Sequence, residues 1–588
     1  MDMHKQLSHF DLLATAPGGV AKLRELILTL AVQGKLVPQD PADEPAGELL
    51  KRIRAEKDRL MAEGKVKRDK PLAPIAEDDQ PFELPMGWEW VPLGEVVEIV
   101  RGITFPANEK TKEPAPGRIG CLRTANIQAQ IEWDDLLFIA ESFVGREDQK
   151  LQLNDIVMSM ANSRELVGKV ALVKSIPIPE ATFGGFLGVM RPWLLEPQFV
   201  MALLRTPYAR SALIDSASQT TNIANISLGK LRPFLFPLPP LPEQARIVAR
   251  VEELMRLCDA LEAKGRQQAA HHTQLVNTLL GNLTDSAAPD EQADDLPTRW
   301  QRVALHFDTL LDRPEAIDAL EQTILQLAVR GQLVPQDPTD EPASELLKRI
   351  RAEKDRLMAK GKIKRDKPLA PIAEDEQPFE LPPGWEWAKF GDLAQISSGV
   401  TLGRKTPIAK PVCLPYLRVA NVQRWELNLS SMKEVIIEED ELPRFKVCHG
   451  DLLITEGGDW DKVGRTAIWR DELPTCLHQN HVFKARGLNA EWNPVWAELY
   501  LNSEAARNYF AASAKQTTNL ASINMTELKN CAFPLPPLPE QARIVARVEH
   551  LRRLCAELRQ RLAQSHTTQA ALADALVSVA SAVDTATD

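Results

Sequence analysis

The chain contains a long internal repeat, and this constrains its fold more than any other feature. Residues 237–254 read "PLPPLPEQARIVARVEEL", and residues 534–551 repeat them with one substitution. Residues 34–90 match residues 331–387 at 50 of 57 positions, at the same separation of 297 residues. Such self-similarity predicts two tandem copies of one structural frame related by a pseudo-twofold axis.

Two dissimilar segments lie inside this repeated frame, residues 91–236 (the first insert) and residues 388–533 (the second insert). Similar frames around different inserts indicate a scaffold that presents two modules with two different targets. The alternative is a recent duplication whose inserts merely drift. At 588 residues the chain is long enough for three or four domains. We predict five segments: an N-terminal helical region (1–90), the first insert (91–236), a central helical region (237–387), the second insert (388–533) and a C-terminal helix (534–588).

Apolar residues after each "LPEQAR" alternate in steps of four and three, which is the seam of a coiled coil. We therefore expect helices over about residues 243–280, 298–330 and 20–33. The first two would form an antiparallel hairpin, and the two ends of the chain would pair in the same way. The predicted seam consists of Ile247, Val251, Leu254, Cys258 and Leu261 in the first copy and Ile544, Val548, Leu551, Cys555 and Leu558 in the second.

Two further frame motifs precede each insert. The segment "ELLKRIRAEKDRL" predicts a helix, and a basic run follows it that is either a solvated surface or a phosphate contact. Paired tryptophans in "GWEW" are expected to open the first strand of each insert as core residues. The basic runs are Lys65, Lys67, Arg68 and Lys70, and Lys362, Lys364, Arg365 and Lys367; the tryptophan pairs are Trp88 with Trp90 and Trp385 with Trp387.

Composition limits the classes of protein that remain. The chain is 44% hydrophobic with no apolar run of eighteen residues, its beginning lacks a secretory signal, and its seven cysteines include no CxxC pair. A cytoplasmic protein with reduced thiols and no membrane span is expected. The net charge is -11, yet the first insert carries 15 basic and 15 acidic residues and the second 17 of each. If the chain binds DNA, the two inserts should bind it.

The repeated motifs resemble the specificity subunit of type I restriction-modification enzymes. The resemblance rests on "PLPPLPEQARIVARVE" and "FELPxGWEW", each present twice, and on the insert endings "QTTNIANISLGKL" and "QTTNLASINMTEL". It implies two target recognition domains of mixed α/β fold, separated by long antiparallel coiled-coil helices with a pseudo-twofold repeat. Each domain would recognise one half of a bipartite, asymmetric double-stranded DNA target.

The resemblance also implies partners. The repeated helices would dock two methyltransferase subunits, and two restriction subunits would add ATP-driven translocation and cleavage. S-adenosylmethionine, ATP and Mg²⁺ would be used by those partners, with no cofactor on this chain. The sequence agrees, because it contains neither a GxxxxGK[ST] phosphate loop nor an NPPY-like or DPPY-like tetrapeptide.

Candidate DNA-contacting residues fall into two groups. Both inserts carry "LR.AN.Q", whose arginine and asparagine suit bidentate base contacts. Because the two domains would have different targets, we expect a motif that they share to hold the fold or a phosphate. Residues unique to one insert are therefore better candidates for base recognition. The shared residues are Arg123, Asn126, Arg418 and Asn421, and the others are Asn162, Arg164, Lys169, Arg465, Gln479 and Asn480.

Three alternatives remain open from the sequence. The inserts could bind proteins, in which case binding need not fall steeply with salt. The chain could belong to a methylation-only system, or could itself be a nuclease or methyltransferase with an unrecognised site. A zinc site was also weighed for Cys448, His449, Cys476, His478 and His481, but their spacing fits no usual zinc motif and packing roles are favoured.

Overall fold

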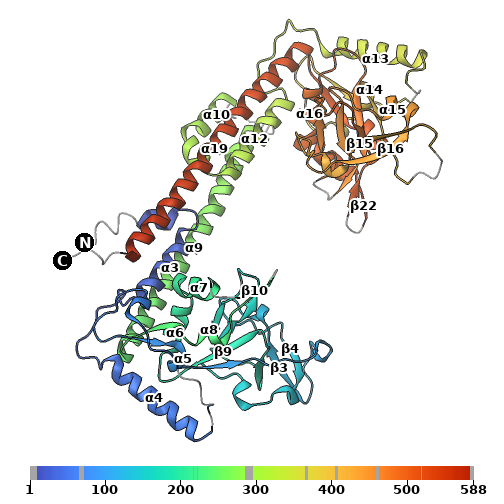
Figure 1. Cartoon of the computed structure of the whole chain (residues 1–588). Coiled ribbons are helices and arrows are strands. Elements are labelled where there is room, and N and C mark those ends of the chain that lie inside the picture. The colour runs from blue at the N-terminus through green and yellow to red at the C-terminus, as the bar shows by residue number, and fades with distance from the viewer. Residues whose placement is uncertain are drawn as a thin grey trace. The chain divides into compact units, whose positions relative to one another are not determined.

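The computed structural model describes residues 10–64, 66, 72–215, 218–220, 223–284, 296–363, 368–403, 408–458, 462–517 and 520–582. The chain divides into two compact units, Met1–Gln268 with Ser565–Asp588 (the first unit) and Ala269–Gln564 (the second unit). Each unit contains one insert and the frame elements that carry it (Figure 1). Mixed α/β domains joined to long helices are the predicted fold class.

Helix contacts in the first unit involve elements of both copies of the frame. Helix α3 (Gly19–Val32) follows the short α2 (Phe10–Thr15), and the long α9 (Leu241–Thr284) begins directly after the first insert. Arg24 of α3 donates to Asp259 and Glu262 of α9 at 2.5 and 2.6 Å. Lys22 lies 3.3 Å from Asp574 of the C-terminal helix α19 (Leu538–Ala582). The expected pairing of the chain ends therefore exists, but α3 also has a partner in its own copy that the prediction left out.

The second unit repeats this arrangement. Arg559 of α19 bonds Asp318 and Glu321 of α12 (Pro314–Val329) at 2.5 and 2.9 Å. The expected single helix over 298–330 is wrong, because the structure has α10 (Leu296–Leu305), α11 (Phe307–Leu310) and α12 instead. Pro314 stands in the first turn of α12, where its missing N–H is tolerated, and so a new helix begins there.

The seam positions face inward in each unit. Ile247 and Cys258 are buried and the other three residues of the first stripe are half-buried. Ile544, Val548 and Cys555 are buried in the second stripe, where Leu551 and Leu558 are half-buried. The distal residues of α9, Val276 and Leu280, belong to the same apolar cluster as Ile544. Burial of these stripes is the main source of helix packing energy.

The described residues of each insert form four small sheets. In the first, β1 (Glu89–Pro92) pairs with β12 (Leu235–Leu238), and an antiparallel sheet has the order β2 (Val97–Arg101), β9 (Leu187–Pro192), β5 (Ile156–Ser159), β7 (Val170–Leu172). A three-stranded sheet has the order β4 (Leu137–Ala140), β3 (Arg118–Leu122), β8 (Ala181–Phe183), with β3 and β8 parallel. The hairpin β10 (Ser218–Thr220) and β11 (Ile223–Asn225) pairs with β6 (Ala161–Asn162). The helices are α5 (Leu93–Val96), α6 (Pro197–Leu204), α7 (Pro207–Asp215) and α8 (Leu228–Leu231).

The second insert has the same topology with different side chains. Its sheets are β13 (Glu386–Lys389) with β24 (Ala532–Leu535); β14 (Ala394–Ser397), β21 (Val482–Gly487), β17 (Leu452–Thr455) and β19 (Thr466–Ile468); β16 (Lys433–Glu438), β15 (Pro411–Leu417) and β20 (Leu477–His478); and β18 (Gly457–Gly458), β23 (Leu520–Ser522) and β22 (Lys515–Thr517). The helices are α14 (Phe390–Leu393), α15 (Leu442–Phe445), α16 (Pro494–Leu501), α17 (Glu504–Ser513) and α18 (Met525–Asn530).

A buried junction ties the repeated motifs together in the first unit. Glu243 of "LPEQAR" accepts hydrogen bonds from Trp88 Nε1 (2.9 Å) and Gln39 Nε2 (3.1 Å), while Arg246 bonds Asp43 at 2.6 Å. Three sequence blocks far apart in the chain thus meet around one carboxylate. Burial raises the pKa of Glu243, and the two donors act against that rise.

The second unit contains the same junction. Glu540 accepts from Trp385 Nε1 and Gln336 Nε2, both at 3.0 Å, and Arg543 bonds Asp340 at 2.7 Å. These bonds give a physical reason for the repeated sequence, because each frame uses the same side chains to attach its helix to its insert. The predicted boundaries at 90/91 and 236/237 fall inside β1 and β12, which form part of this attachment.

The helices expected from "ELLKRIRAEKDRL" are α4 (Ala46–Ala62) and α13 (Ala343–Ala359). Each buries its apolar side, with Leu49 and Ile53 at 1% and 0% exposure in α4. Trp88 and Trp385 are buried, as expected of core residues, although each lies one residue before its strand. Of the predicted basic runs, only Lys362 lies within the described residues.

Candidate nucleic-acid interface

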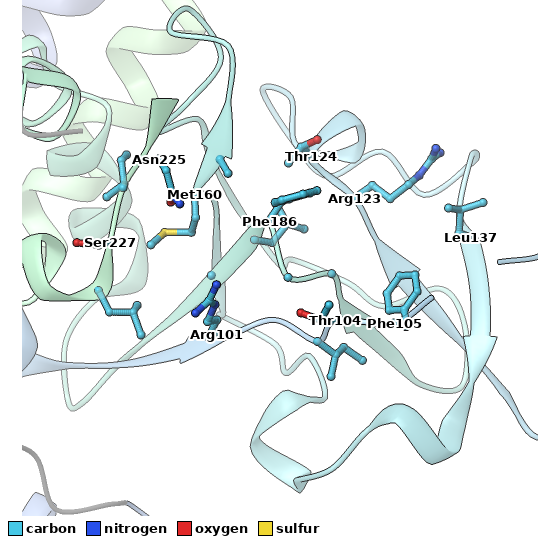
Figure 2. A pocket seen from close by; sticks show the side chains of 18 of the residues that line it. Arg101, Thr104, Phe105, Arg123, Thr124, Leu137, Met160, Phe186, Asn225 and Ser227 are labelled. Atoms are coloured by element: carbon cyan, nitrogen blue, oxygen red, sulfur yellow. The ribbon is translucent and has the colours of Figure 1, made fainter. Parts of the chain in front are cut away.

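A cleft of about 580 Å³ lies in the first insert, where the end of β2, the turn after β8 and the end of β11 meet. Figure 2 shows Phe186 near its middle, with Met160 and Asn225 on one side and Arg123 and Phe105 on the other. Cationic, amide and aromatic side chains therefore share one open surface. These are the side-chain types that contact phosphates and base edges in DNA complexes.

The turn after β8, formed by Gly184, Gly185 and Phe186, is fixed by backbone contacts. Gly184 N donates to Leu122 O at 3.0 Å, and Phe186 O accepts from Met160 N at 2.8 Å. A Cβ at Gly102 would lie 2.1 Å from Gly184 O, so only glycine allows β2 to approach this closely. The Phe186 side chain is left 67% exposed.

The second insert has the same turn after β20, with Gln479, Asn480 and His481. Gln479 N donates to Leu417 O at 2.9 Å, and His481 O accepts from Glu456 N at 3.0 Å. Gly399 plays the part of Gly102, since its Cβ would lie 1.9 Å from His478 O. The backbone is therefore equivalent in the two inserts.

The side chains on this shared backbone differ. Phe186 and Met160 of the first insert correspond to His481 and Glu456 of the second, where His481 Nδ1 lies 2.6 Å from Glu456 Oε2. An apolar pair in one insert is thus an ionisable, hydrogen-bonded pair in the other. An exchange of this kind changes which base edges a surface can contact.

The shared "LR.AN.Q" residues have structural contacts. Asn126 is buried, accepts from Arg123 N at 2.8 Å and donates to Glu132 O at 3.0 Å. Arg123 Nη2 donates to Asp135 Oδ2 at 2.6 Å, and one edge of its side chain lines the cleft. These contacts indicate that the role of Asn126 is to hold the loop in place.

The second copy repeats this loop. Asn421 is buried, accepts from Arg418 N at 3.0 Å and donates to Asn428 O at 2.8 Å, while Arg418 Nη2 donates to Ser431 O at 2.7 Å. The amide of Asn421 is therefore engaged with backbone, as that of Asn126 is. Both asparagines hold backbone atoms of their loops, and a role for them in contacting DNA stays a prediction.

The glutamine of the same motif carries a further shared contact. Lys169 Nζ donates to Gln128 Oε1 at 3.1 Å, and Arg465 Nη1 donates to Gln423 Oε1 at 2.5 Å. Each insert thus holds one predicted cation, Lys169 or Arg465, against this loop. Both cations are half-buried, and their attachment orients them.

The residues unique to one insert lie near the turn. Asn162 is in β6, opposite Ala224 of β11, and Arg164 follows it in an exposed loop. Gln479 and Asn480 form the turn itself in the second insert and are half-buried. The structure thus brings Gln479 and Asn480 together with His481.

Four further cleft or turn residues were missing from the predicted DNA contacts: Arg101, Met160, Phe186 and Glu456. His481 was expected to have a packing and hydrogen-bonding role rather than to bind a metal, and it was not among the predicted DNA contacts. Aligning "TFGGFLG" with "LHQNHVF" would have placed Phe186 opposite His481, and this comparison is the signal that could have found them.

The histidines and cysteines of the second insert have packing and hydrogen-bonding contacts. His478 is fully buried, with Nδ1 2.7 Å from Val482 O, and burial lowers its pKa to about 3. Burial raises the pKa of the Cys476 thiol to about 12. Within the described parts of the chain, no three His, Cys, Asp or Glu side chains are grouped so that they could hold a metal ion. Nor does any helix among the described residues have the length and apolar character needed to cross a membrane.

Comparison with known proteins gives a consistent result. The family model described as "Type I restriction modification DNA specificity domain" matches twice, at residues 85–271 and 382–565. The EcoEI specificity subunit of Escherichia coli is 36% identical, with 96% of this chain and 94% of that protein aligned. The EcoAI specificity subunit of Escherichia coli is also 36% identical over the same shares of the two chains.

Solved structures of lower similarity were also found. The HsdS subunit from Thermoanaerobacter tengcongensis aligns with a TM-score of 0.38 at 19% identity, covering 86% of this chain and 99% of that one. A chain from a structure of type I R-M complex assembly aligns with a TM-score of 0.44 at 21% identity, covering 86% of this chain and all of that one. From the double family match and the two near-full-length relatives, this chain belongs to the family of type I restriction-modification specificity subunits.

Proposed function

We propose that the two inserts recognise the two halves of a bipartite, asymmetric double-stranded DNA target. The observation that carries this proposal is one backbone turn built twice, with Phe186 in the first insert and His481 in the second. Equivalent positions with different side chains suit two half-sites of different sequence. Phosphate contacts would come from exposed cations of the inserts such as Lys110.

The proposed complex supplies the chemistry that this chain lacks. Two methyltransferase subunits dock on the repeated helices and methylate adenine with S-adenosylmethionine. Two restriction subunits add ATP- and Mg²⁺-dependent translocation and cleavage. This chain is non-catalytic alone, which is supported by the family assignment and by the absence from its sequence of phosphate-loop and adenine-methyltransferase motifs.

Methylation mapping tests the proposal directly. The chain is produced with its methyltransferase partner, and adenine methylation is mapped on DNA containing all short sequence combinations. We expect two specific half-sites separated by a fixed number of unspecified base pairs, and DNA affinity that falls steeply with salt. Methylation without a bipartite target, or DNA cleavage or methylation by this chain alone, would contradict the proposal.

A further inference from the structure

We propose that the turns after β8 and β20 are the specificity-determining positions of the two inserts, with Phe186 and Met160 in the first and His481 and Glu456 in the second. This inference rests on the proposed function and identifies the residues through which each insert distinguishes its half-site. The turn and the residue facing it come from separate strand pairs, β8–β9 and β5–β6 in the first insert and β20–β21 and β17–β18 in the second. The backbone bond from Met160 N to Phe186 O recurs as the bond from Glu456 N to His481 O.

The backbone contacts around this position are the same in both inserts, so the exchange is one of side chains. Ile226 N bonds Met160 O at 2.8 Å, and Ile523 N bonds Glu456 O at 2.9 Å. Thr104 and Thr401 follow the two close-contact glycines at equal spacing. A position that keeps its backbone bonds while its side chains change can acquire a new preference without refolding.

The exposed side chains at this position differ in what they can recognise. Phe186 is apolar, 67% exposed, and lies in the same cleft as the exposed Arg101. In the major groove an apolar side chain contacts the thymine methyl group, and arginine pairs with guanine. The first half-site is therefore expected to contain a thymine opposite Phe186 next to a guanine.

The second insert presents hydrogen-bonding groups instead. Glu456 is held by His481 at 2.6 Å, Gln479 and Asn480 lie in the same turn, and Ser398 stands where the first insert has Arg101. Carboxylates accept from the cytosine amino group, and amides pair with adenine. The second half-site is therefore expected to present adenine or cytosine amino groups at the corresponding step.

The test uses the full chain with its methyltransferase partner and a DNA library in which both half-sites are randomised. Phe186→Ala removes the apolar contact, and the double variant Met160→Glu, Phe186→His installs the pair of the second insert. We expect Phe186→Ala to lower the preference for thymine at one position of the first half-site roughly tenfold. The double variant should change the preferred base there, with the second half-site and the spacing unchanged.

A matched control is available in the same insert. Leu153 is 62% exposed, lies outside the cleft and corresponds to His449 of the second insert. Like Phe186→His, Leu153→His replaces an exposed apolar side chain by the histidine of the second insert, but at a position away from the cleft. This variant should keep every base preference of the wild-type complex. Unchanged preferences in Phe186→Ala, or a shift that Leu153→His reproduces, would overturn the inference.

The outcomes also separate this inference from the proposed function. A wild-type complex without two half-sites contradicts the function itself. A bipartite wild-type target with an unaltered first half-site in Phe186→Ala contradicts only the assignment of the turn. If the double variant binds no DNA, Phe186→Ala still decides, because it truncates an exposed side chain and leaves the backbone bonds of the turn in place.

Discussion

The junction between frame and insert and the turn after β8 or β20 are each built twice, but they differ in what is repeated. At the junction the side-chain bonds recur, with Trp88 2.9 Å from Glu243 and Trp385 3.0 Å from Glu540. At the turn only the backbone bonds recur, and Phe186 is exchanged for His481. Side-chain identity is therefore constrained where side-chain atoms make the structural bonds, and is free to change where the backbone makes them.

Exchanging a whole insert should have the largest effect. We expect replacement of residues 93–235 by residues 390–532 to convert the target into an interrupted palindrome of the second half-site. The graft joins at β1 and β12, whose pairing register is the same as that of β13 and β24, so the frame should accept it. Methylation mapping of the chimera with its partner measures the target.

The reciprocal graft is the control for this chimera and should give a palindrome of the first half-site. Spacing between half-sites should be nearly that of the parent, because the frame helices are retained. If either graft altered both half-sites, recognition would not be modular.

Removing the junction carboxylate should have a smaller effect than exchanging an insert. It should lower the free energy of unfolding of the first and second units by equal amounts. Glu243→Ala leaves Trp88 Nε1 buried without an acceptor, which costs about 1–3 kcal/mol for an unsatisfied buried donor. Glu540→Ala should destabilise the second unit by a similar amount, since its bonds have nearly the same lengths. Both effects are measured by urea unfolding of each variant, with hydrogen exchange used to assign the loss of stability to one unit or the other.

Glu252→Ala is the matched control, because Glu252 is exposed on the same helix as Glu243. It should leave the free energy of unfolding within about 0.5 kcal/mol of the parent. If Glu243→Ala and Glu540→Ala lowered the free energy of unfolding by strongly unequal amounts, the two junctions would not be energetically equivalent.

Sequence alone predicted the frame well because its signals are local and repeated. Heptad spacing predicted α9, and the proline of "LPEQ" predicted its start. Of the "GWEW" tryptophans expected in the core, Trp88 and Trp385 are buried, whereas Trp90 and Trp387 are half-buried. The break before α12 was missed because the apolar rhythm continues through Leu310 and Leu311, although Pro314 marks a new first turn. The partner of α3 in its own copy was missed because its contacts are ion pairs far apart in sequence.

The side chains at the turn could not be predicted from a fixed repeat distance. At the frame separation of 297 residues, Phe186 stands opposite Phe483, which is buried in β21. The equivalent residue is His481, because the second insert is shorter by two residues before this point and longer by two after it. The backbone bonds, Met160 N to Phe186 O and Glu456 N to His481 O, establish the correspondence.

The most local predicted effect concerns one buried carboxyl group of the second insert and appears only as a pH dependence. Glu498 of α16 is 4% exposed and corresponds to Met201 of α6 in the first insert. Burial raises its pKa to about 7, against the opposing effect of Arg470 at 3.6 Å. One carboxylate oxygen also accepts from Ile468 N at 3.1 Å.

The raised pKa determines the direction of the pH effect. The folded state holds the proton of Glu498 more tightly than the unfolded state, so the stabilisation is fully present below pH 4.5 and is lost as pH rises through about 7. Glu498→Gln keeps an acceptor for Ile468 N and removes the titration. The free energy of unfolding of the second unit, relative to this variant, should therefore fall between pH 4.5 and 7 by an amount on the order of 3 kcal/mol. Met201→Gln in the first unit is the matched control and should show no such pH-dependent difference from the parent. If the free energy of unfolding had the same pH dependence in Glu498→Gln and in the parent, Glu498 would not be the source of the effect.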